Sequence, residues 1–231
     1  MKTLIIGKGE IGTSLQRVLS PFYETYIKDI EPLEVEGIEV LHICFPYSKK
    51  FIKQVEEYKK QYKPRFVIIH STVPVGTCAK LNVFHSPVRG IHPHLEQSLL
   101  TFVKYLAPYS EDLVKYFEKA HIQIKQVSET KTTELLKLYC TTIYGVNIIA
   151  QKEVMKECKR IGADFDIVYT DCNNSYNSGY EKLGFPKFKK YVLDYMEGEI
   201  GGHCVTNNCK LLKKNSHLAK FILEENDRYK K

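Results

Sequence analysis

The first 127 residues alternate short apolar runs with stretches in which apolar residues recur at helical spacing. Lys2–Ile6 forms the first run, typical of a strand buried on both faces, and from Ile11 to Leu19 the apolar residues fall on one face of a helix. The alternation predicts further strands at residues 22–27, 38–45, 66–69, 81–85, 102–107 and 122–127, with helices at 48–62, 95–100 and 111–120. Ser110 is expected to cap the last of these helices. Such alternation predicts a parallel sheet with helices on both faces.

The pattern changes after residue 128. From Glu129 to Ile161 there is no proline and a single glycine, Gly145, and the apolar residues form an almost continuous stripe. We predict one helix of roughly 30 residues, about 45 Å long at 1.5 Å per residue. A helix of that length exceeds what one small domain can bury, so we expect a homodimer through residues 129–161.

Weaker signals follow the long helix. Gly162 is expected to end it, and Asp164 can cap a short helix beyond it. The pattern assigns no element to residues 173–200, where the polar stretch 173–180 suits either a sugar pocket or a surface loop. One final helix is predicted from about Asn207 to Arg228, with Thr206 as its cap.

A glycine motif, GKGEIG at residues 7–12, stands between the first strand and the first helix. Gly7 allows a tight turn, Gly9 lets backbone approach a pyrophosphate, and Gly12 lets the helix pack on the strand. The helix N-terminus at Glu10 and Ile11 would offer N–H groups and a positive dipole end to the phosphates. A glycine-rich turn without a ligand is the alternative.

We therefore predict an α/β protein in which a Rossmann-type doubly wound parallel sheet, residues 1–127, binds NAD. An α-helical domain built on the long helix, residues 128–231, follows it. Asp29, 17 residues beyond Gly12, is placed to hold the adenosine ribose and favours NAD over NADP, because a carboxylate repels a 2′-phosphate. A solvated loop acid is the alternative. Pro46 and Ser71 follow two other strands and are assigned to the cofactor as well.

Composition and charge add limits. The 231 residues are 43% hydrophobic and 26% charged, as in ordinary globular proteins, and no apolar run approaches the ~18 residues of a membrane span. The N-terminus lacks the features of a signal peptide, so we expect a cytoplasmic protein with no membrane partner. The net charge of +7 favours an anionic small molecule and not nucleic acid, although a solvated lysine-rich surface explains it equally. The seven cysteines include no C-x-x-C pair, and no metal site is predicted.

Four motifs together resemble one family. They are GKGEIG at 7–12, STVPVGT at 71–77, the segment 133–164 that begins TELLKLYC, and GEIGGHC at 198–204. In this order the chain resembles the nucleotide-sugar dehydrogenases (the UDP-glucose and UDP-ManNAc types) within the 6-phosphogluconate dehydrogenase-like superfamily. It resembles a divergent, truncated member in which the family's C-terminal nucleotide-binding domain is lacking.

The resemblance implies roles for particular residues. Cys204 matches the thiol that attacks an aldehyde intermediate, Lys137 matches the active-site lysine, and Thr72 matches a threonine beside nicotinamide. A thiolate forms a thiohemiacetal readily, and an ammonium stabilises a developing alkoxide. A buried structural cysteine and a solvated helix lysine are the plain alternatives.

The chain also departs from the family pattern. Thr141 stands where the family has asparagine, Asn208 where it has aspartate, and Val88 near the position of the family's glutamate. In VRGIHPH, Arg89, His92 and His94 are suited to holding a carboxylate or a phosphate. The residues assigned to substrate binding are Arg89, His92, Thr141, Gly201, Gly202, His203 and Asn208.

The prediction is an NAD-dependent oxidoreductase that acts on a sugar-like or small anionic alcohol or carbonyl. A non-catalytic NAD-binding sensor or partner subunit is the alternative, because acidic positions of the family are replaced. A third interpretation keeps the cofactor and uses it in reduction or epimerisation.

Overall fold

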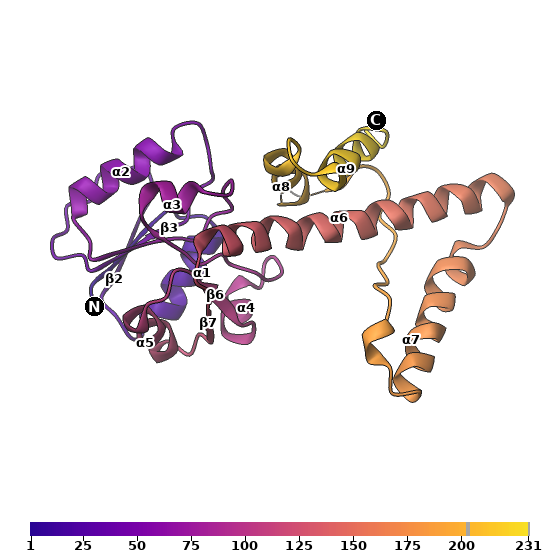
Figure 1. Cartoon of the computed structure of the whole chain (residues 1–231), viewed down its shortest axis with the longest axis horizontal. Helices are drawn as coiled ribbons and strands as arrows, with labels where there is room; N and C mark the ends of the chain where they lie inside the picture. Colours follow the sequence, from indigo (N-terminus) through magenta and orange to yellow (C-terminus); the bar gives the residue numbers. More distant parts are fainter. Residues whose placement is uncertain (202–203, 231) are drawn as a thin grey trace. The chain divides into compact units, whose positions relative to one another are not determined.

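The computed structural model describes residues 1–201 and 204–230, which divide into two compact units, Met1–Lys137 and Leu138–Lys231. The first unit is built on a five-stranded parallel sheet in the order β2-β1-β3-β4-β5 (Figure 1). Its strands are β1 (Thr3–Ile6), β2 (Thr25–Lys28), β3 (Val40–Ile43), β4 (Phe66–Ile69) and β5 (Phe84–His85). All neighbouring strands pair in parallel, with Ile6 of β1 opposite Lys28 on one side and Ile43 on the other.

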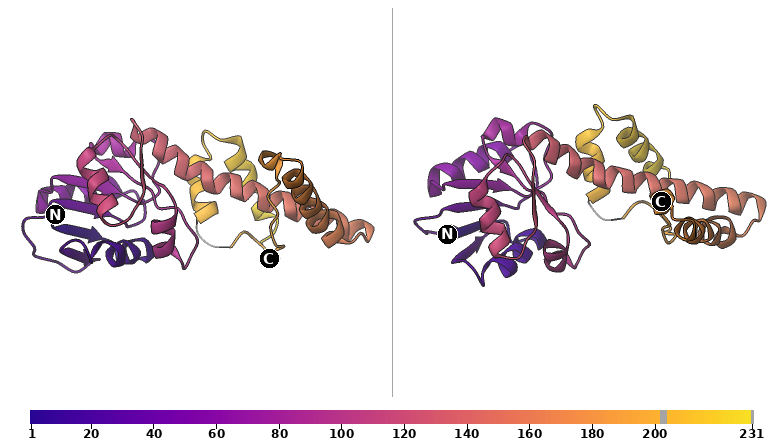
Figure 2. Two further views of the ribbon diagram at one scale, coloured as in Figure 1. Left: turned by 90° about the horizontal axis from the view of Figure 1, so that it is seen from below. Right: turned by 60° about the horizontal axis from the view of Figure 1, so that its bottom comes forward.

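Helices cover both faces of this sheet (Figures 1 and 2). On one face Ile5, Val40 and Ile68 pack against α1 (Glu10–Leu19), α4 (Leu95–Thr101) and α5 (Glu111–Lys119). On the other, Leu4, Leu41 and Val67 pack against α2 (Phe51–Tyr62) and α3 (Thr77–Leu81). Successive residues of a strand point to opposite faces of the sheet. Because helices cover both faces, both sets of strand residues are apolar, which explains the continuous apolar runs in the sequence. The predicted doubly wound parallel sheet is confirmed.

The later strands differ from the prediction. Of the strand expected at residues 81–85, Leu81 is instead the last residue of helix α3 (Thr77–Leu81), and Asn82, with φ +51°, ends that helix. Only Phe84–His85 form the strand β5. The strands β6 (Lys104–Leu106) and β7 (Ile124–Gln126) pair with each other in a separate two-stranded sheet. One antiparallel bridge, His85 to Ala107, joins β5 to this pair. The Ser110 side chain caps α5 by accepting from Leu113 N–H, as predicted.

The long helix α6 runs from Thr130 to Ile161, 32 residues and about 48 Å at 1.5 Å per residue. Gly162, with φ +73°, follows its end, and Asp164 Oδ1 accepts hydrogen bonds from the N–H groups of Asp166 and Ile167. A π-helical segment (Asp166–Asp171) then leads into α7 (Cys172–Lys182), with a short 3₁₀ turn at Pro186–Phe188. The polar stretch 173–180 is thus helical, and not the loop that one interpretation of the sequence required.

The second unit closes with two helices where the sequence predicted one. Helix α8 (Cys204–Leu212) begins at Cys204, so Thr206 lies in its first turn and does not cap it. Helix α9 (His217–Asp227) begins after Ser216, whose side chain accepts from Ala219 N–H. This capping hydrogen bond begins a new helix within the segment 207–228, which the spacing of apolar residues had predicted to be a single helix.

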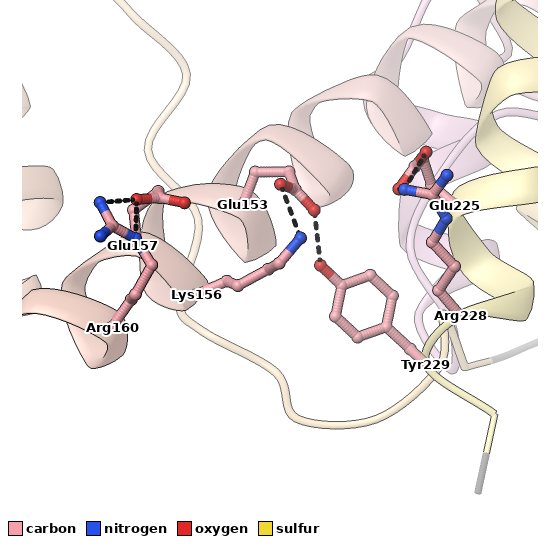
Figure 3. Close-up of polar contacts among 7 residues, drawn as sticks. All are labelled: Glu153, Lys156, Glu157, Arg160, Glu225, Arg228 and Tyr229. Carbon is pink, nitrogen blue, oxygen red and sulfur yellow. Dashed lines mark hydrogen bonds and ion pairs between the residues drawn. The ribbon is translucent and has the colours of Figure 1, made fainter.

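Helices α8 and α9 pack along α6 (Figure 2). A Cβ on Gly145 of α6 would lie 2.7 Å from Val205 and 3.2 Å from Ile222, so the glycine permits this approach. Near the end of the chain, the Tyr229 hydroxyl donates to Glu153 Oε1 over 3.2 Å, while Glu153, Glu157 and Glu225 each contact a basic side chain three residues further on (Figure 3). No helix in the described part of the chain is both long and apolar enough to span a membrane.

Candidate active site

The glycine turn after β1 shows where close packing is needed and where space is open. A Cβ on Gly12 would lie 1.9 Å from the Gly7 carbonyl oxygen, and Gly7 itself has φ +109° with the Cys44–Phe45 backbone 3.0 Å from its would-be Cβ. A Cβ on Gly9 would meet nothing within 4 Å. Gly9 is the N-cap of α1, and no side chain caps that helix end. The turn thus has tight walls at Gly7 and Gly12 and an open, donor-rich side at Gly9.

The other predicted cofactor residues lie at the same edge of the sheet. Asp29 follows β2 and is exposed, and Pro46 lies just past the end of β3. Ser71 follows β4, and its hydroxyl donates to the Phe45 carbonyl oxygen over 2.6 Å. The chain crosses to opposite sides of β1 in forming β2 and β3, which makes the end of β1 a topological switch point, where open α/β sheets bind ligands.

The first turns of α6 hold the loops that follow β4 and β5. Glu134, only 1% exposed, accepts hydrogen bonds from Gly76 N–H over 2.6 Å and Cys78 N–H over 2.8 Å. This carboxylate therefore satisfies the N-terminus of α3, where a negative charge is favoured. One turn further, Lys137 Nζ donates to the Val88 carbonyl oxygen over 2.8 Å. Lys137 is thus placed at the carboxyl edge of the sheet, as are Ser71 and Thr72.

The polar residues of the VRGIHPH segment make contacts of their own. The Arg89 guanidinium donates to the Val103 carbonyl oxygen over 2.8 Å and lies 4.9 Å from the centre of the Tyr105 ring. His92 Nδ1 contacts the carboxylate of Glu10. The pair connects this segment to the first turn of α1, beside the glycine turn.

In the second unit, two of the three positions that depart from the resemblance, Thr141 and Asn208, contact each other. Asn208 Nδ2 donates to Thr141 Oγ1 over 2.7 Å, and Asn208 is buried. Cys204 is exposed at the first position of α8, four residues before Asn208, so the two fall on one side of that helix. A Cβ on Gly201 would meet nothing within 4 Å. Gly202 and His203, also assigned to the substrate, lie outside the described residues.

A cluster of buried polar side chains on the side of the sheet that α5 covers was not predicted from the sequence. It comprises Thr3, His42, His70, Ser86, Lys104 and Tyr116, all nearly or fully buried. Burial lowers the pKa of His42 to about 3 and that of Lys104 to about 7, and it holds the pKa of His70 well below its ordinary value. One feature of the sequence could have indicated this cluster: His42 and Lys104 are ionisable residues inside apolar runs, VLHICF and FVKYL. Among the residues that the structure describes, no cluster of three or more His, Cys, Asp or Glu is arranged to hold a metal.

Solved structures share this architecture. UDP-D-ManNAc dehydrogenase from Pyrococcus horikoshii aligns with 99% of the chain at 18% identity and a TM-score of 0.77, and the chain covers 69% of it. NDP-N-acetyl-D-galactosaminuronic acid dehydrogenase from Methanosarcina mazei aligns with 98% at 14% identity and a TM-score of 0.68, with 66% of it covered. The fold is that of the nucleotide-sugar dehydrogenases.

A second kind of dehydrogenase shares the fold over nearly its whole length. The 3-hydroxyisobutyrate dehydrogenase of Mycobacterium tuberculosis aligns with 99% of this chain at 10% identity and a TM-score of 0.72, and 94% of it is covered. The chain thus spans about two thirds of the nucleotide-sugar dehydrogenases and nearly all of this hydroxyacid enzyme. No protein-family model and no curated protein matches the sequence.

Proposed function

We propose that the protein is a nicotinamide-dinucleotide-dependent oxidoreductase that acts on a sugar-like or small anionic alcohol or carbonyl and prefers NAD to NADP. The observation that carries the proposal is the glycine turn at the switch point, closed at Gly7 and Gly12 and open at Gly9. The fold, shared with dehydrogenases of two substrate classes, supports the same conclusion. The net charge of +7 suits an anionic substrate.

The residues of the glycine turn fit a dinucleotide. The N–H groups at Glu10 and Ile11 would face the pyrophosphate, and the dipole of α1 would favour its charge. Asp29 would accept hydrogen bonds from the adenosine ribose hydroxyls, and Pro46 and Ser71 would line the path to the nicotinamide. A bound nicotinamide supplies a hydride acceptor or donor.

Three residues would act on the substrate. Lys137 would stabilise negative charge on the reacting oxygen, because its ammonium is already placed at the carboxyl edge of the sheet by the Val88 carbonyl oxygen. Thr72, on the loop after β4, would lie between cofactor and substrate. Cys204, at the N-terminus of α8, would hold the carbonyl carbon through its sulfur.

A homodimer through α6 belongs to the same proposal. Ile143 and Ile161 on this helix are 56% and 64% exposed, and α7 has no buried residue. Apolar area of this kind is stabilised by burial against another surface. Sedimentation of the wild type and of Ile143→Glu tests it: dimeric wild type and a monomeric variant are expected, and a monomeric wild type refutes it.

The test of the cofactor site uses the difference between two glycines. Gly9 has backbone angles that valine also adopts (φ −69°, ψ −177°), and the space around an added Cβ is open, so Gly9→Val should leave the melting temperature unchanged. The valine side chain would occupy the space of the pyrophosphate, so NADH should bind at least roughly tenfold more weakly, a loss of about 1.4 kcal/mol. Gly179→Val, in helix α7 with equally open space, is the matched control and should bind NADH as the wild type does. Wild-type protein that binds neither NADH nor NADPH in calorimetric titration overturns the proposal.

Turnover distinguishes an enzyme from a sensor. Sugar phosphates, nucleotide sugars and hydroxy acids, supplied with NAD, should give NADH absorbance with at least one substrate, and Lys137→Ala and Cys204→Ala should abolish it. The second candidate, a non-catalytic dinucleotide sensor, is supported by the replacement of a family aspartate by Asn208, whose side-chain amide donates a hydrogen bond to Thr141. Tight NADH binding without turnover, in the wild type and both variants, would support that candidate.

A further inference from the structure

The segment Ser86–Val88, directly after β5, is held through its carbonyl oxygens by three basic side chains. His70 Nδ1 lies 2.6 Å and Lys104 Nζ 2.6 Å from the Ser86 oxygen, and Lys104 Nζ also lies 3.2 Å from the Pro87 oxygen. Lys137 Nζ takes the next carbonyl, that of Val88. Three carbonyls in a row thus accept from three side chains of different parts of the fold, and Lys104 contacts two of the three.

The hydrogen bonds fix the direction of the histidine contacts. A carbonyl only accepts, so His70 Nδ1–H donates to Ser86 and its neutral ring leaves Nε2 as an acceptor. His42 Nδ1–H therefore donates to His70 Nε2 over 2.7 Å, and His42 Nε2 accepts from the Tyr116 hydroxyl over 3.0 Å. The Thr3 hydroxyl begins the chain by donating to the Tyr116 oxygen over 2.9 Å. Four side chains in series thus end on one of the two lone pairs of the Ser86 oxygen.

Lys104 takes the remaining lone pair without a carboxylate. It is 4% exposed on β6, and in the described part of the chain no ion pair involves it. An uncharged amine has two hydrogens, which match the two carbonyl oxygens within its reach. A charged ammonium has three, and the surroundings left for the third are the Phe117 ring, whose centre is 6.0 Å from Nζ, and a small cavity that Lys104 itself lines.

The titratable groups that face Lys104 are His42 and Cys44 from β3 and its end, His70 after β4, His85 on β5, Arg89 after β5, and Lys137 on α6. Of these, Lys137 and Arg89 oppose a positive charge on Lys104. Cys44 is the one group able to become negative, and burial raises its pKa to about 12. Burial first, and then Lys137 and Arg89, lower the pKa of Lys104 to about 7, although Cys44 acts in the opposite direction.

We propose that Lys104 is a positioning residue: it holds the Ser86–Val88 carbonyl row, and the row in turn sets the place of the Lys137 ammonium. Proton uptake by Lys104 adds a second positive charge on the same short segment, which repels the Lys137 ammonium. A cavity of about 10 Å³, lined by Lys104, Arg89 and Ser98 among others, has room for about one water molecule through which a proton can arrive. The inference rests on the proposed function only in giving Lys137 a catalytic task.

The test needs neither substrate nor cofactor. In protein with ¹³C,¹⁵N-lysine, the Nζ–Cε signal of Lys104, identified by its loss in Lys104→Met, should titrate near pH 7. The Lys137 signal, identified by Lys137→Met, should show a second inflection at the same pH, and Lys104→Met should lack it. A Lys104 signal that titrates near ~10.4, the ordinary value for lysine, overturns the inference, as does a Lys137 profile identical in wild type and Lys104→Met.

Hydrogen exchange tests the carbonyl row itself. At pH 8.5, peptide 84–91 should exchange roughly tenfold faster in Lys104→Met than in the wild type, as expected for lost hydrogen bonds worth about 1.4 kcal/mol. Equal exchange in the two proteins overturns the inference. If Lys104→Met fails to fold, Lys104→Gln, which keeps two N–H donors, should exchange as the wild type does, and faster exchange overturns the inference. Lys125→Met, an exposed lysine of β7, is the control and should behave as the wild type does. Failure of NADH binding would refute the proposed function and leave these results unaffected.

Discussion

Three buried histidines should make the sheet unit sensitive to acid. His42, His70 and His85 are fully buried, and burial is the first cause of the lowered pKa of each, to about 3 for His42 and His85. In the unfolded chain each would titrate near ~6.5. Because the folded state resists protonation, these groups contribute stability that is fully present above pH 6.5 and is lost as the pH falls from there towards 3.

The loss is large on the scale of protein stability. At pH 5 the unfolded state gains about 2 kcal/mol from protonation of each of His42 and His85, from 1.36 kcal/mol per pH unit below ~6.5. These two histidines together cost about 4 kcal/mol relative to pH 8, and His70 adds to the loss in the same direction. That equals much of the 5–15 kcal/mol that typically separates folded from unfolded states, so we expect the sheet to unfold between about pH 6 and pH 4.

Urea denaturation followed by circular dichroism at pH 8, 7, 6 and 5 measures this loss. The histidine ¹³Cε1–H signals give a direct check, since the signals of His42, His70 and His85 should not titrate until the protein unfolds. The exposed His217 serves as the control: His217→Gln should leave the pH dependence unchanged. A free energy of unfolding that is flat between pH 7 and pH 5, or a His42 signal that titrates near pH 6.5 in the folded protein, would refute the reasoning.

Three further predictions follow from single contacts. Glu134→Gln replaces one carboxylate oxygen, an acceptor, with an N–H₂ group that faces a backbone N–H. The free energy of unfolding should fall by about 2 kcal/mol, and hydrogen exchange should quicken at residues 74–80. The exposed Glu129→Gln is the control and should change neither quantity. Ser216→Ala removes the cap of α9 and should lower the free energy of unfolding of the second unit by about 1 kcal/mol, measured against Ser175→Ala on exposed α7. Asp29→Asn removes the charge that would repel a 2′-phosphate, so the ratio of NADPH to NADH affinity in calorimetry should rise; an unchanged ratio would place the ribose elsewhere.

The sequence by itself determined the elements whose pattern is local. The apolar runs of the sheet, the Ser110 cap, the proline-free stretch that becomes α6 and the Gly162 stop are all read within a few neighbouring residues. The glycine motif belongs here too, because the strand before it and the helix after it are visible in the same twenty residues. Periodicity and capping are properties of one turn or one strand, which is why they survive without knowledge of the rest of the chain.

Tertiary structure decided what depends on residues far apart in the chain. The pairing of Thr141 with Asn208, the carbonyl row held by Lys104 and Lys137, and the His42–His70 contact all join residues from different elements, whose relative positions no spacing encodes. The break between α8 and α9 belongs to this group, since one apolar stripe at helical spacing fits one helix as well as two that pack on α6. A buried lysine or histidine in a strand is unremarkable as sequence, and only the fold shows which carbonyl and which ring it meets.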